Sequence, residues 1–169
     1  GRGFHFGNFY HQERDSWAAY LKGDYQLTPT IQLSAGYRYS HDEVKVSNYD
    51  GYFGETTAEG VRVLSVPVFL NADKSETYEN SSFELGLDWQ ANDDMLLYLT
   101  FSQGYRSGAI NGQAFSDAAA EITSADPEEV NSFEAGIKSE FLDGRLIVNS
   151  AIFHYDYKNQ QFVIAEGGG

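Results

Sequence analysis

The sequence predicts an all-β chain, a segment of an antiparallel transmembrane β-barrel with about six long strands. Three observations predict it: apolar and polar residues alternate with period two, the links between strands alternate between short and long, and aromatic residues and glycine are abundant. The 169 residues include twelve Tyr, twelve Phe and seventeen Gly. Such residues suit a pleated surface with tight turns.

The first pair of strands is expected at residues 16–27 and 30–40. In the first of them, Trp17 and Leu21 fall on one face, whereas Lys22 and Asp24 fall on the other. This is the periodicity of a strand and not the 3.6-residue period of a helix. The link at residues 28–29 contains a proline and is short, so it predicts a hairpin.

Two further hairpins follow. Residues 82–90 and 95–104 alternate in the same way and are joined at 91–94, and residues 133–142 and 145–162 are joined at Asp143–Gly144. Asp-Gly favours a tight turn because both positions tolerate a positive φ. In the last strand we place four residues on the apolar face, Ala151, Phe153, Tyr155 and Tyr157, with His154, Asp156 and Lys158 opposite.

The two remaining links are long and hydrophilic, at roughly residues 42–80 and 106–130. Alternating short and long links are typical of outer-membrane barrels, which have tight periplasmic turns and long extracellular loops. We expect both links to be loops, and loops of this length usually carry function or are disordered.

The alternation alone leaves two environments open, because a soluble β-sandwich also has one apolar face. Aromatic residues near the strand ends favour the membrane, where they would form two interfacial girdles. The girdle residues we predict are Trp17, Tyr39, Trp89, Tyr105, Tyr155 and Tyr157. Six strands cannot close a barrel, and an open edge in lipid leaves backbone groups unpaired. We therefore expect residues 1–169 to be part of the barrel of a larger protein.

The composition excludes several classes of function. The net charge is −14, so a nucleic-acid partner is not expected. The mean hydropathy is −0.44 and no run is long enough for a transmembrane helix. There is no cysteine, and the acidic residues of the long links lack the spacing of a calcium-binding loop. With no nucleophile–base set either, we expect no catalytic residues, no metal site and no cofactor, and hence no enzyme.

Residues 98–162 resemble a known family. The stretch Tyr98-Leu-Thr-Phe-Ser-Gln-Gly-Tyr-Arg-Ser-Gly-Ala-Ile-Asn-Gly112 is similar to a pattern of TonB-dependent receptor barrels, and so are Asp126–Lys138, Leu142–Leu146 and Ala151–Gln161. These pieces cover about 65 residues in the family's order. Residues 12–97 fit only as generic barrel strands. The family's plug domain and its short TonB-contacting segment are not visible in this sequence.

The resemblance implies a function and candidate residues. It implies energised uptake of a scarce solute across the outer membrane of a Gram-negative bacterium, with TonB acting through the plug domain. A ferric siderophore is the commonest ligand, and cobalamin and glycans are alternatives. The lumen or plug contacts would include Arg38, Glu84, Glu134 and Lys138, and the ligand-loop contacts Arg106 and Asn111. The barrel would also contact lipid and lipopolysaccharide. A passive porin-like channel and a soluble β-sandwich binding module remain the alternatives.

Overall fold

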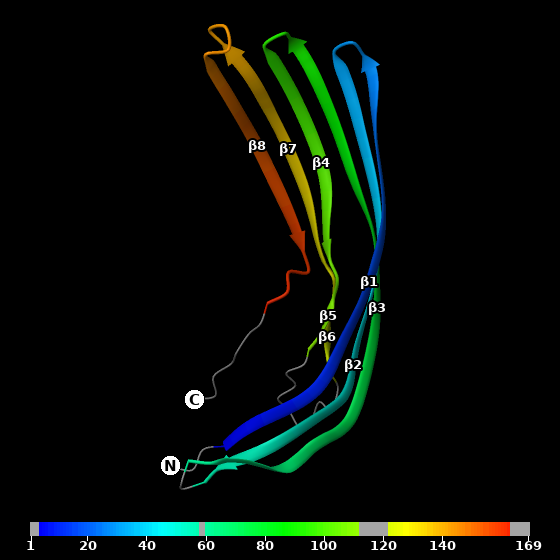
Figure 1. The fold of residues 1–169 in the computed structure, drawn as a ribbon, viewed down its shortest axis with the longest axis vertical. Coiled ribbons are helices and arrows are strands. Elements are labelled where there is room, and N and C mark those ends of the chain that lie inside the picture. The colour runs from blue at the N-terminus through cyan, green and yellow to red at the C-terminus, as the bar shows by residue number, and fades with distance from the viewer. Residues whose placement is uncertain (1–3, 58–59, 112–121, 163–169) are drawn as a thin grey trace. The chain divides into compact units, whose positions relative to one another are not determined.

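The computed structural model describes residues 4–57, 60–111 and 122–162, which form strands and the turns between them (Figure 1). The strands are β1 (Phe4–Thr28), β2 (Ile31–Thr56), β3 (Arg62–Asn92), β4 (Met95–Arg106), β5 (Ala109–Ile110), β6 (Ser124–Ala125), β7 (Glu128–Phe141) and β8 (Leu146–Lys158). Six form one sheet in the order β1-β2-β3-β4-β7-β8, and β5 pairs with β6. The prediction of an all-β fold with about six long antiparallel strands is confirmed.

In two of the short turns, a side-chain oxygen accepts a hydrogen bond from a backbone amide. At residues 29–30, the amide of Ile31 donates to Thr28 Oγ1 at 3.0 Å. At the β3–β4 turn, the amide of Asp94 donates to Asn92 Oδ1 at 3.0 Å. Asp, Asn and Thr favour turns for this reason. The turns lie at residues 29–30 and 93–94, one and two residues later than the predicted links at 28–29 and 91–94 begin.

The third turn is wider than expected. Leu142, Asp143 and Gly144 all have positive φ, at 55°, 56° and 78°, so the expected positive φ at Asp143 and Gly144 is confirmed. The turn has four residues and not two, because the last cross-strand pair is Phe141 with Leu146. Its ends are tied by the amide of Arg145, which donates to the Leu142 carbonyl at 3.3 Å. Figure 1 shows this turn at the same end of the strands as the other two.

The face assignment predicted for β8 is wrong. Cross-strand partners share a face of a sheet, and the register pairs Glu134 with Phe153 and Ser132 with Tyr155. Phe153, Tyr155 and Tyr157 therefore share a face with Glu134 and Lys138. The opposite face of β8 carries Leu146, Val148, Ser150, Ile152, His154 and Asp156. Both sets contain apolar residues, so apolarity alone could not choose between them.

The long link expected at 42–80 is also mostly strand. β2 continues to Thr56, and β3 begins at Arg62. The chain reverses between them, where the amide of Thr57 donates to the Val61 carbonyl at 2.8 Å and Gly60 has a φ of 82°. In the second long link, β5 and β6 form a small hairpin, and residues 112–121 lie outside the described residues. Much of both links is polar, but residues 61–70 are largely apolar and were wrongly included in the predicted loop.

The chain divides into two compact units. The first, which we call the loop unit, comprises Gly1–Ser16, His41–Tyr78 and Gly108–Asp126. The second, which we call the sheet unit, comprises Trp17–Ser40, Glu79–Ser107 and Pro127–Gly169. β1, β2 and β3 contribute to both units.

The loop unit has a small hydrophobic core. Its buried hydrophobic side chains are Val44, Val46, Tyr49, Ile110 and Ile122, and Tyr78 packs against them. Val46 and Tyr49 are both buried although they are three residues apart on one strand. Asn48 between them has a φ of 52°, which interrupts the alternation and turns both side chains inward.

Polar contacts bind the β5–β6 hairpin to the rest of the loop unit. Lys74 Nζ donates to the Ile122 carbonyl at 2.7 Å, and Arg14 donates to the Gly108 carbonyl at 3.3 Å. Tyr78 donates its hydroxyl proton to the Ala125 carbonyl at 3.4 Å. Burial raises the pKa of Tyr78, so this hydroxyl keeps the proton that it donates. The hairpin is thus part of the folded loop unit.

Candidate functional site

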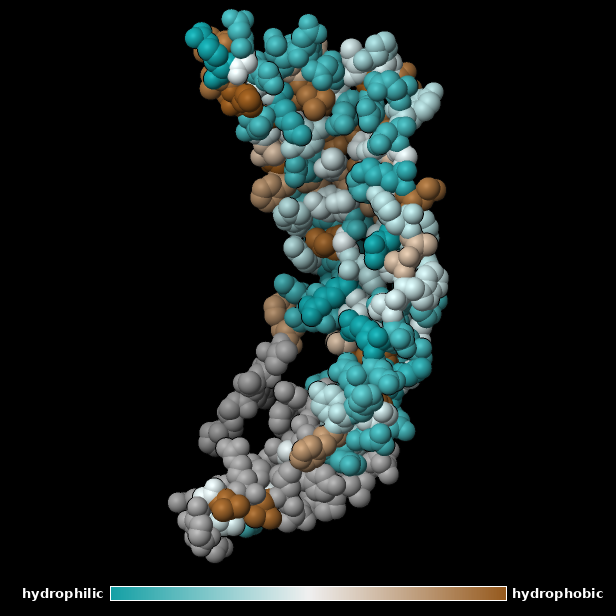
Figure 2. Space-filling view, in the orientation of Figure 1, coloured by the Kyte–Doolittle hydropathy of each residue, from teal (hydrophilic) through white to brown (hydrophobic). Residues whose placement is uncertain are grey.

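The sheet unit has two faces of different chemistry, and the register defines them. One row across the strands contains Leu87, Leu99, Ala135 and Ile152, and the next row contains Gly86, Thr100, Glu134 and Phe153. We call the face of the first row the apolar face and that of the second row the polar face. Figure 2 shows hydrophobic side chains at the surface among hydrophilic ones near the three tight turns.

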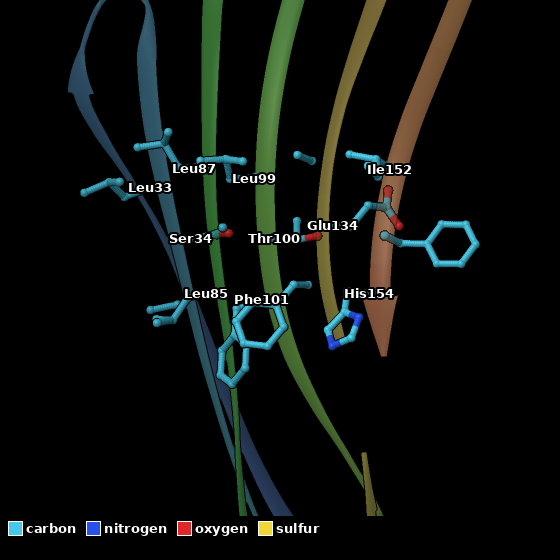
Figure 3. A pocket seen from close by; sticks show the side chains of 15 residues that line it. Leu33, Ser34, Leu85, Leu87, Leu99, Thr100, Phe101, Glu134, Ile152 and His154 are labelled. Atoms are coloured by element: carbon cyan, nitrogen blue, oxygen red, sulfur yellow. The ribbon is translucent and has the colours of Figure 1, made fainter. Parts of the chain in front are cut away.

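The apolar face leaves large hydrophobic side chains uncovered. Leu99 is 54% exposed and Ile152 75% exposed. Figure 3 shows Leu33, Leu87, Leu99 and Ile152 in one row, with Leu85, Phe101 and His154 in the next. They line an open hollow of about 910 Å³. A surface of this kind is unfavourable in water and suits contact with lipid chains.

Aromatic rings on the apolar face contact one another across the strands. Trp17 and Tyr39 lie 5.4 Å apart between ring centroids, and Phe101 and Phe133 lie 4.9 Å apart. Trp89 lies nearer the turns on the same face, opposite Leu97. The sequence signal for these residues was their alternation with polar neighbours.

The girdle prediction needs one correction. Tyr155 and Tyr157 pair with Ser132 and Val130, so they belong to the polar face and not to a lipid-facing girdle. Trp17, Tyr39, Trp89 and Tyr105 lie on the apolar face, and their role as girdle residues stays a prediction.

Glu84, one of the predicted lumen contacts, forms an ion pair on the polar face. Lys22 Nζ of β1 lies 2.5 Å from Glu84 Oε1 of β3. Gly36 of β2 lies between them, and a Cβ added there would meet Glu84 Cβ at 3.3 Å and the Tyr20 hydroxyl at 3.5 Å. The glycine therefore leaves room for a pair that connects strands on both sides of it.

Tyr98 connects the other two predicted contacts, Glu134 and Lys138. Its hydroxyl donates to Glu134 Oε1 at 2.6 Å, and Lys138 Nζ lies 5.4 Å from the centre of its ring. The ring lies on Gly136, where an added Cβ would be 2.3 Å from Tyr98 Cζ. A cation over an aromatic ring is attracted by the ring's negative face. We call this set, Tyr98, Glu134, Gly136 and Lys138, the tyrosine joint.

The remaining predicted contacts are dispersed. Arg38 Nε donates to Ser40 Oγ at 3.1 Å. Arg106, in the sheet unit, has an exposed side chain that lies 3.4 Å from Glu128 Oε2. Asn111, in the loop unit, donates its amide proton to the Thr123 carbonyl at 2.7 Å and so extends the β5–β6 hairpin. Asn111 thus has a structural role in addition to the ligand contact predicted for it.

The alternation in the sequence placed Tyr98 on the polar side of its strand, but its contacts with Glu134 and Lys138 were not predicted. Tyr20 was not assigned to a face, and the aromatic residues of β8 were assigned to the wrong one. The position of the Tyr98 ring could have been predicted, because Gly136 is its cross-strand partner and a large ring beside a glycine can fold over it. For β8 the face could have been predicted from the Asp143–Gly144 turn. A turn at this position pairs even-numbered residues of β7 with odd-numbered residues of β8, so that the two sets share a face.

Two searches of the described residues were negative. In the ranges 4–57, 60–111 and 122–162, no group of three or more His, Cys, Asp or Glu side chains is arranged to hold a metal ion. Within the same ranges there is no helix long and apolar enough to cross a membrane.

Long antiparallel strands, tight turns at one end, and one apolar and one polar face are the features of the wall of a membrane β-barrel. They define the class of this chain as a membrane β-barrel protein. A family model described as "TonB dependent receptor-like, beta-barrel" matches residues 3–169. The chain therefore belongs to the TonB-dependent receptor family, which is a family of transport receptors.

Two proteins with similar sequences are both named as receptors, one of them as a TonB-dependent receptor. The chain is 27% identical over 137 residues to the probable TonB-dependent receptor BfrD of Bordetella pertussis, covering 80% of this chain and 17% of BfrD. It is 26% identical over 155 residues to the metal-pseudopaline receptor CntO of Pseudomonas aeruginosa, covering 88% of this chain and 18% of CntO. The chain thus spans less than a fifth of the length of these relatives.

Solved structures share the fold. The ferric yersiniabactin uptake receptor FyuA of Yersinia pestis matches with a TM-score of 0.71 at 17% identity, over 93% of this chain and 22% of FyuA. The ferric-catecholate import receptor Fiu of E. coli matches with a TM-score of 0.64 at 19% identity, over 89% of this chain and 22% of Fiu.

Proposed function

We propose that this chain forms part of the barrel wall of an outer-membrane receptor that takes up a ferric siderophore with energy supplied through TonB. The observation that carries the proposal is the pairing of an uncovered apolar face with a polar face whose charged groups are fixed by hydrogen bonds. A lipid-facing wall needs the first property, and a hydrated lumen suits the second. FyuA and Fiu are named as uptake or import receptors and BfrD as a probable TonB-dependent receptor, which supports energised uptake. CntO is named as a metal-pseudopaline receptor, which extends the class of ligand to other metal chelates.

In this proposal the apolar face contacts lipid and lipopolysaccharide of a Gram-negative outer membrane, and the polar face contacts a plug domain encoded elsewhere in the parent gene. The tyrosine joint and the Lys22–Glu84 pair are candidate plug contacts because their charged atoms remain partly exposed. Arg38 joins them as a candidate of the same face, and Arg106 is a candidate contact for ligand.

Growth under iron limitation tests the proposal. The parent gene is deleted, and uptake of iron-55 from ferric siderophores is compared with uptake by the complemented strain, with and without functional TonB. The expected result is uptake that requires both the parent gene and TonB. A passive channel would instead give uptake that survives loss of TonB, and unchanged uptake in the deletion strain would contradict the proposal.

A further inference from the structure

The described part of the β5–β6 hairpin is short. Within the described residues, two cross-strand pairs form it, Ala109 with Ala125 and Ile110 with Ser124. An isolated two-stranded hairpin is at best marginally stable in water. The position of this hairpin must therefore be set by its contacts with the rest of the loop unit.

Three side chains of β1 and β3 donate hydrogen bonds to backbone carbonyls at the base of the hairpin. The donors Arg14, Lys74 and Tyr78 bind the carbonyls of Gly108, Ile122 and Ala125 at 3.3, 2.7 and 3.4 Å, respectively. Lys74 and Tyr78 lie on the same face of β3, because they are four residues apart. We call Arg14, Lys74 and Tyr78 the hairpin clamp.

The Tyr78 ring also packs against the start of the hairpin. A Cβ added at Gly108 would overlap this ring and the Ala125 carbonyl oxygen. Burial alternates along this part of β3, where Lys74, Glu76 and Tyr78 are half-buried and the odd-numbered residues between them are exposed. The covered face of β3 is thus the face that contacts the hairpin.

Two isoleucines of the hairpin region belong to the core of the loop unit. Ile110 is 4% exposed and Ile122 7% exposed, and both pack in the cluster that contains Val44 and Tyr49. Moving the hairpin away would expose both side chains to water. Each buried isoleucine favours the docked position by roughly tenfold to a hundredfold. Opening is therefore a rare event even before the hydrogen bonds of the clamp are counted.

Docking of the hairpin also places Asn111, the predicted ligand-loop contact. The amide of Asn111 donates to the Thr123 carbonyl at 2.7 Å, and its Nδ2 donates to Thr123 Oγ1 at 3.3 Å. The Asn111 side chain is nevertheless exposed. The clamp thus acts on Asn111 through the hairpin.

We propose that Arg14, Lys74 and Tyr78 keep the β5–β6 hairpin docked on the loop unit in both the resting and the TonB-energised receptor, and so act as positioning residues for Asn111. The base of the hairpin is then a fixed part of the receptor and does not open in each cycle of uptake. The step from Asn111 to a ligand rests on the proposed function, whereas the docking itself is tested without a ligand.

Cysteine labelling in living cells tests the docking. In the full-length receptor, freed of any other cysteine, Ile110→Cys places a thiol at a buried position and Thr123→Cys places one at an exposed position of the same hairpin. Cells with and without functional TonB are treated with a membrane-impermeant maleimide. Ile110→Cys is expected to react at least about tenfold more slowly than Thr123→Cys in both strains. Equal rates in cells with TonB, or no labelling of Thr123→Cys, would overturn the inference.

Weakening the clamp tests which side chains hold the hairpin. Tyr78→Ala is expected to speed the labelling of Ile110→Cys about tenfold, because the ring contact and the hydrogen bond are both lost. Tyr78→Phe keeps the ring and loses a long hydrogen bond, so a change of about twofold is expected. Thr77→Ala, at an exposed neighbouring position of β3, is the matched control.

Each variant is checked for the heat-dependent electrophoretic shift of a folded barrel. If Ile110→Cys does not fold, hydrogen exchange of the amides of residues 109–111 gives the same comparison in receptors with Ile110 intact. Equal effects of Tyr78→Ala and Thr77→Ala would overturn the inference.

Uptake kinetics separate positioning from a purely structural role. The probe is the iron-55 ferric siderophore complex whose uptake requires the parent gene and TonB in the comparison of deleted and complemented strains. Tyr78→Ala is expected to raise the concentration for half-maximal uptake about tenfold at an unchanged maximal rate per folded receptor, because Asn111 is no longer held in place before binding. Tyr78→Phe is expected to restore the original value.

An unchanged half-maximal concentration in Tyr78→Ala, together with faster labelling, would overturn the positioning of Asn111. If no ferric siderophore supports TonB-dependent uptake, the proposed function fails, while the labelling rates still decide the docking. The two failures are therefore distinguishable.

Discussion

The two units of this chain differ in where they place apolar side chains, which are buried in the loop unit and exposed in the sheet unit. Among the described residues, the buried hydrophobic side chains all belong to the loop unit, from Val44 to Ile122. In the sheet unit the buried polar side chains are serines, Ser40, Ser82, Ser107 and Ser139, while large apolar side chains such as Leu21 and Ile152 stay exposed. The loop unit buries its apolar side chains as a protein in water does, whereas the sheet unit leaves them at its surface.

The largest expected effect comes from a charge on the apolar face. Leu99→Arg is expected to destabilise the full receptor in lipid vesicles by about 2–4 kcal/mol, the range for arginine at the middle of a bilayer. Urea unfolding followed by heat-dependent electrophoretic mobility measures it. Ser102→Arg on the polar face is the control, and an equal loss in both variants would contradict the distinction between the faces.

The next effect concerns the core of the loop unit. Ile110→Ala removes a side chain that is 4% exposed and is expected to cost roughly 2 kcal/mol, the low end for such truncations, because the cluster is small. Hydrogen exchange of the amides around Val46 is expected to accelerate, while exchange in the sheet unit stays unchanged. Val61→Ala, at an exposed position of the same unit, is the control. Acceleration spread evenly over both units would show that they do not unfold separately.

A smaller effect is expected at the tyrosine joint. Gly136→Ala places a methyl group where the Tyr98 ring lies, and overpacking of this kind costs about 1–3 kcal/mol. The same substitution at Gly23, where an added Cβ meets nothing within 4 Å, is expected to be close to neutral. Combining Gly136→Ala with Tyr98→Ala should cost less than the sum of the two single variants. Strict additivity, measured by urea unfolding, would argue against the joint.

The smallest effect is a pKa change in the loop unit. The hydrogen bond from Lys45, whose Nζ lies 2.9 Å from Glu43 Oε1, lowers the pKa of Glu43 below its ordinary value of 4.5. A lowered carboxyl pKa stabilises the folded state above the unfolded pKa, and this contribution is lost as the pH falls through the folded pKa. Lys45→Met is expected to return the pKa of Glu43 toward 4.5, as measured by carbon-13 NMR titration. An unchanged pKa would mean that the pair does not persist in solution.

The strands of the sheet unit and their faces were predictable wherever only one parity is apolar. In β4, Leu97, Leu99 and Phe101 alternate with Tyr98, Thr100 and Ser102, so the residues of the apolar face can be read from the sequence. In β8 both faces carry large apolar residues, Leu146, Val148 and Ile152 on the apolar face and Phe153, Tyr155 and Tyr157 on the polar face. Composition could not separate these sets, although the register implied by the β7–β8 turn could.

The contacts of the candidate site were less predictable than its faces. Glu134 and Lys138 were among the predicted lumen or plug contacts, but the residue that joins them, Tyr98, comes from another strand. Likewise, Glu84 pairs with Lys22, which is 62 residues away in sequence. Such partners depend on which strands are neighbours and on their register, and a single sequence fixes neither. Within residues 42–80, Val44 and Val46 are isolated among charged residues, which concealed the end of β2. The apolar run at residues 61–70 was a strand signal that the prediction of a loop left unused.

The continuity of β2 constrains how this chain can change in length. β2 runs from Ile31 to Thr56, and the positive φ of Asn48 shifts its alternation within the loop unit. A single inserted residue between Tyr39 and Val44 would invert either the set of residues on the apolar face or the buried core, whereas two inserted residues would preserve both. Length differences among related chains should therefore occur in even numbers inside this strand, whereas the turns between strands can accept odd numbers.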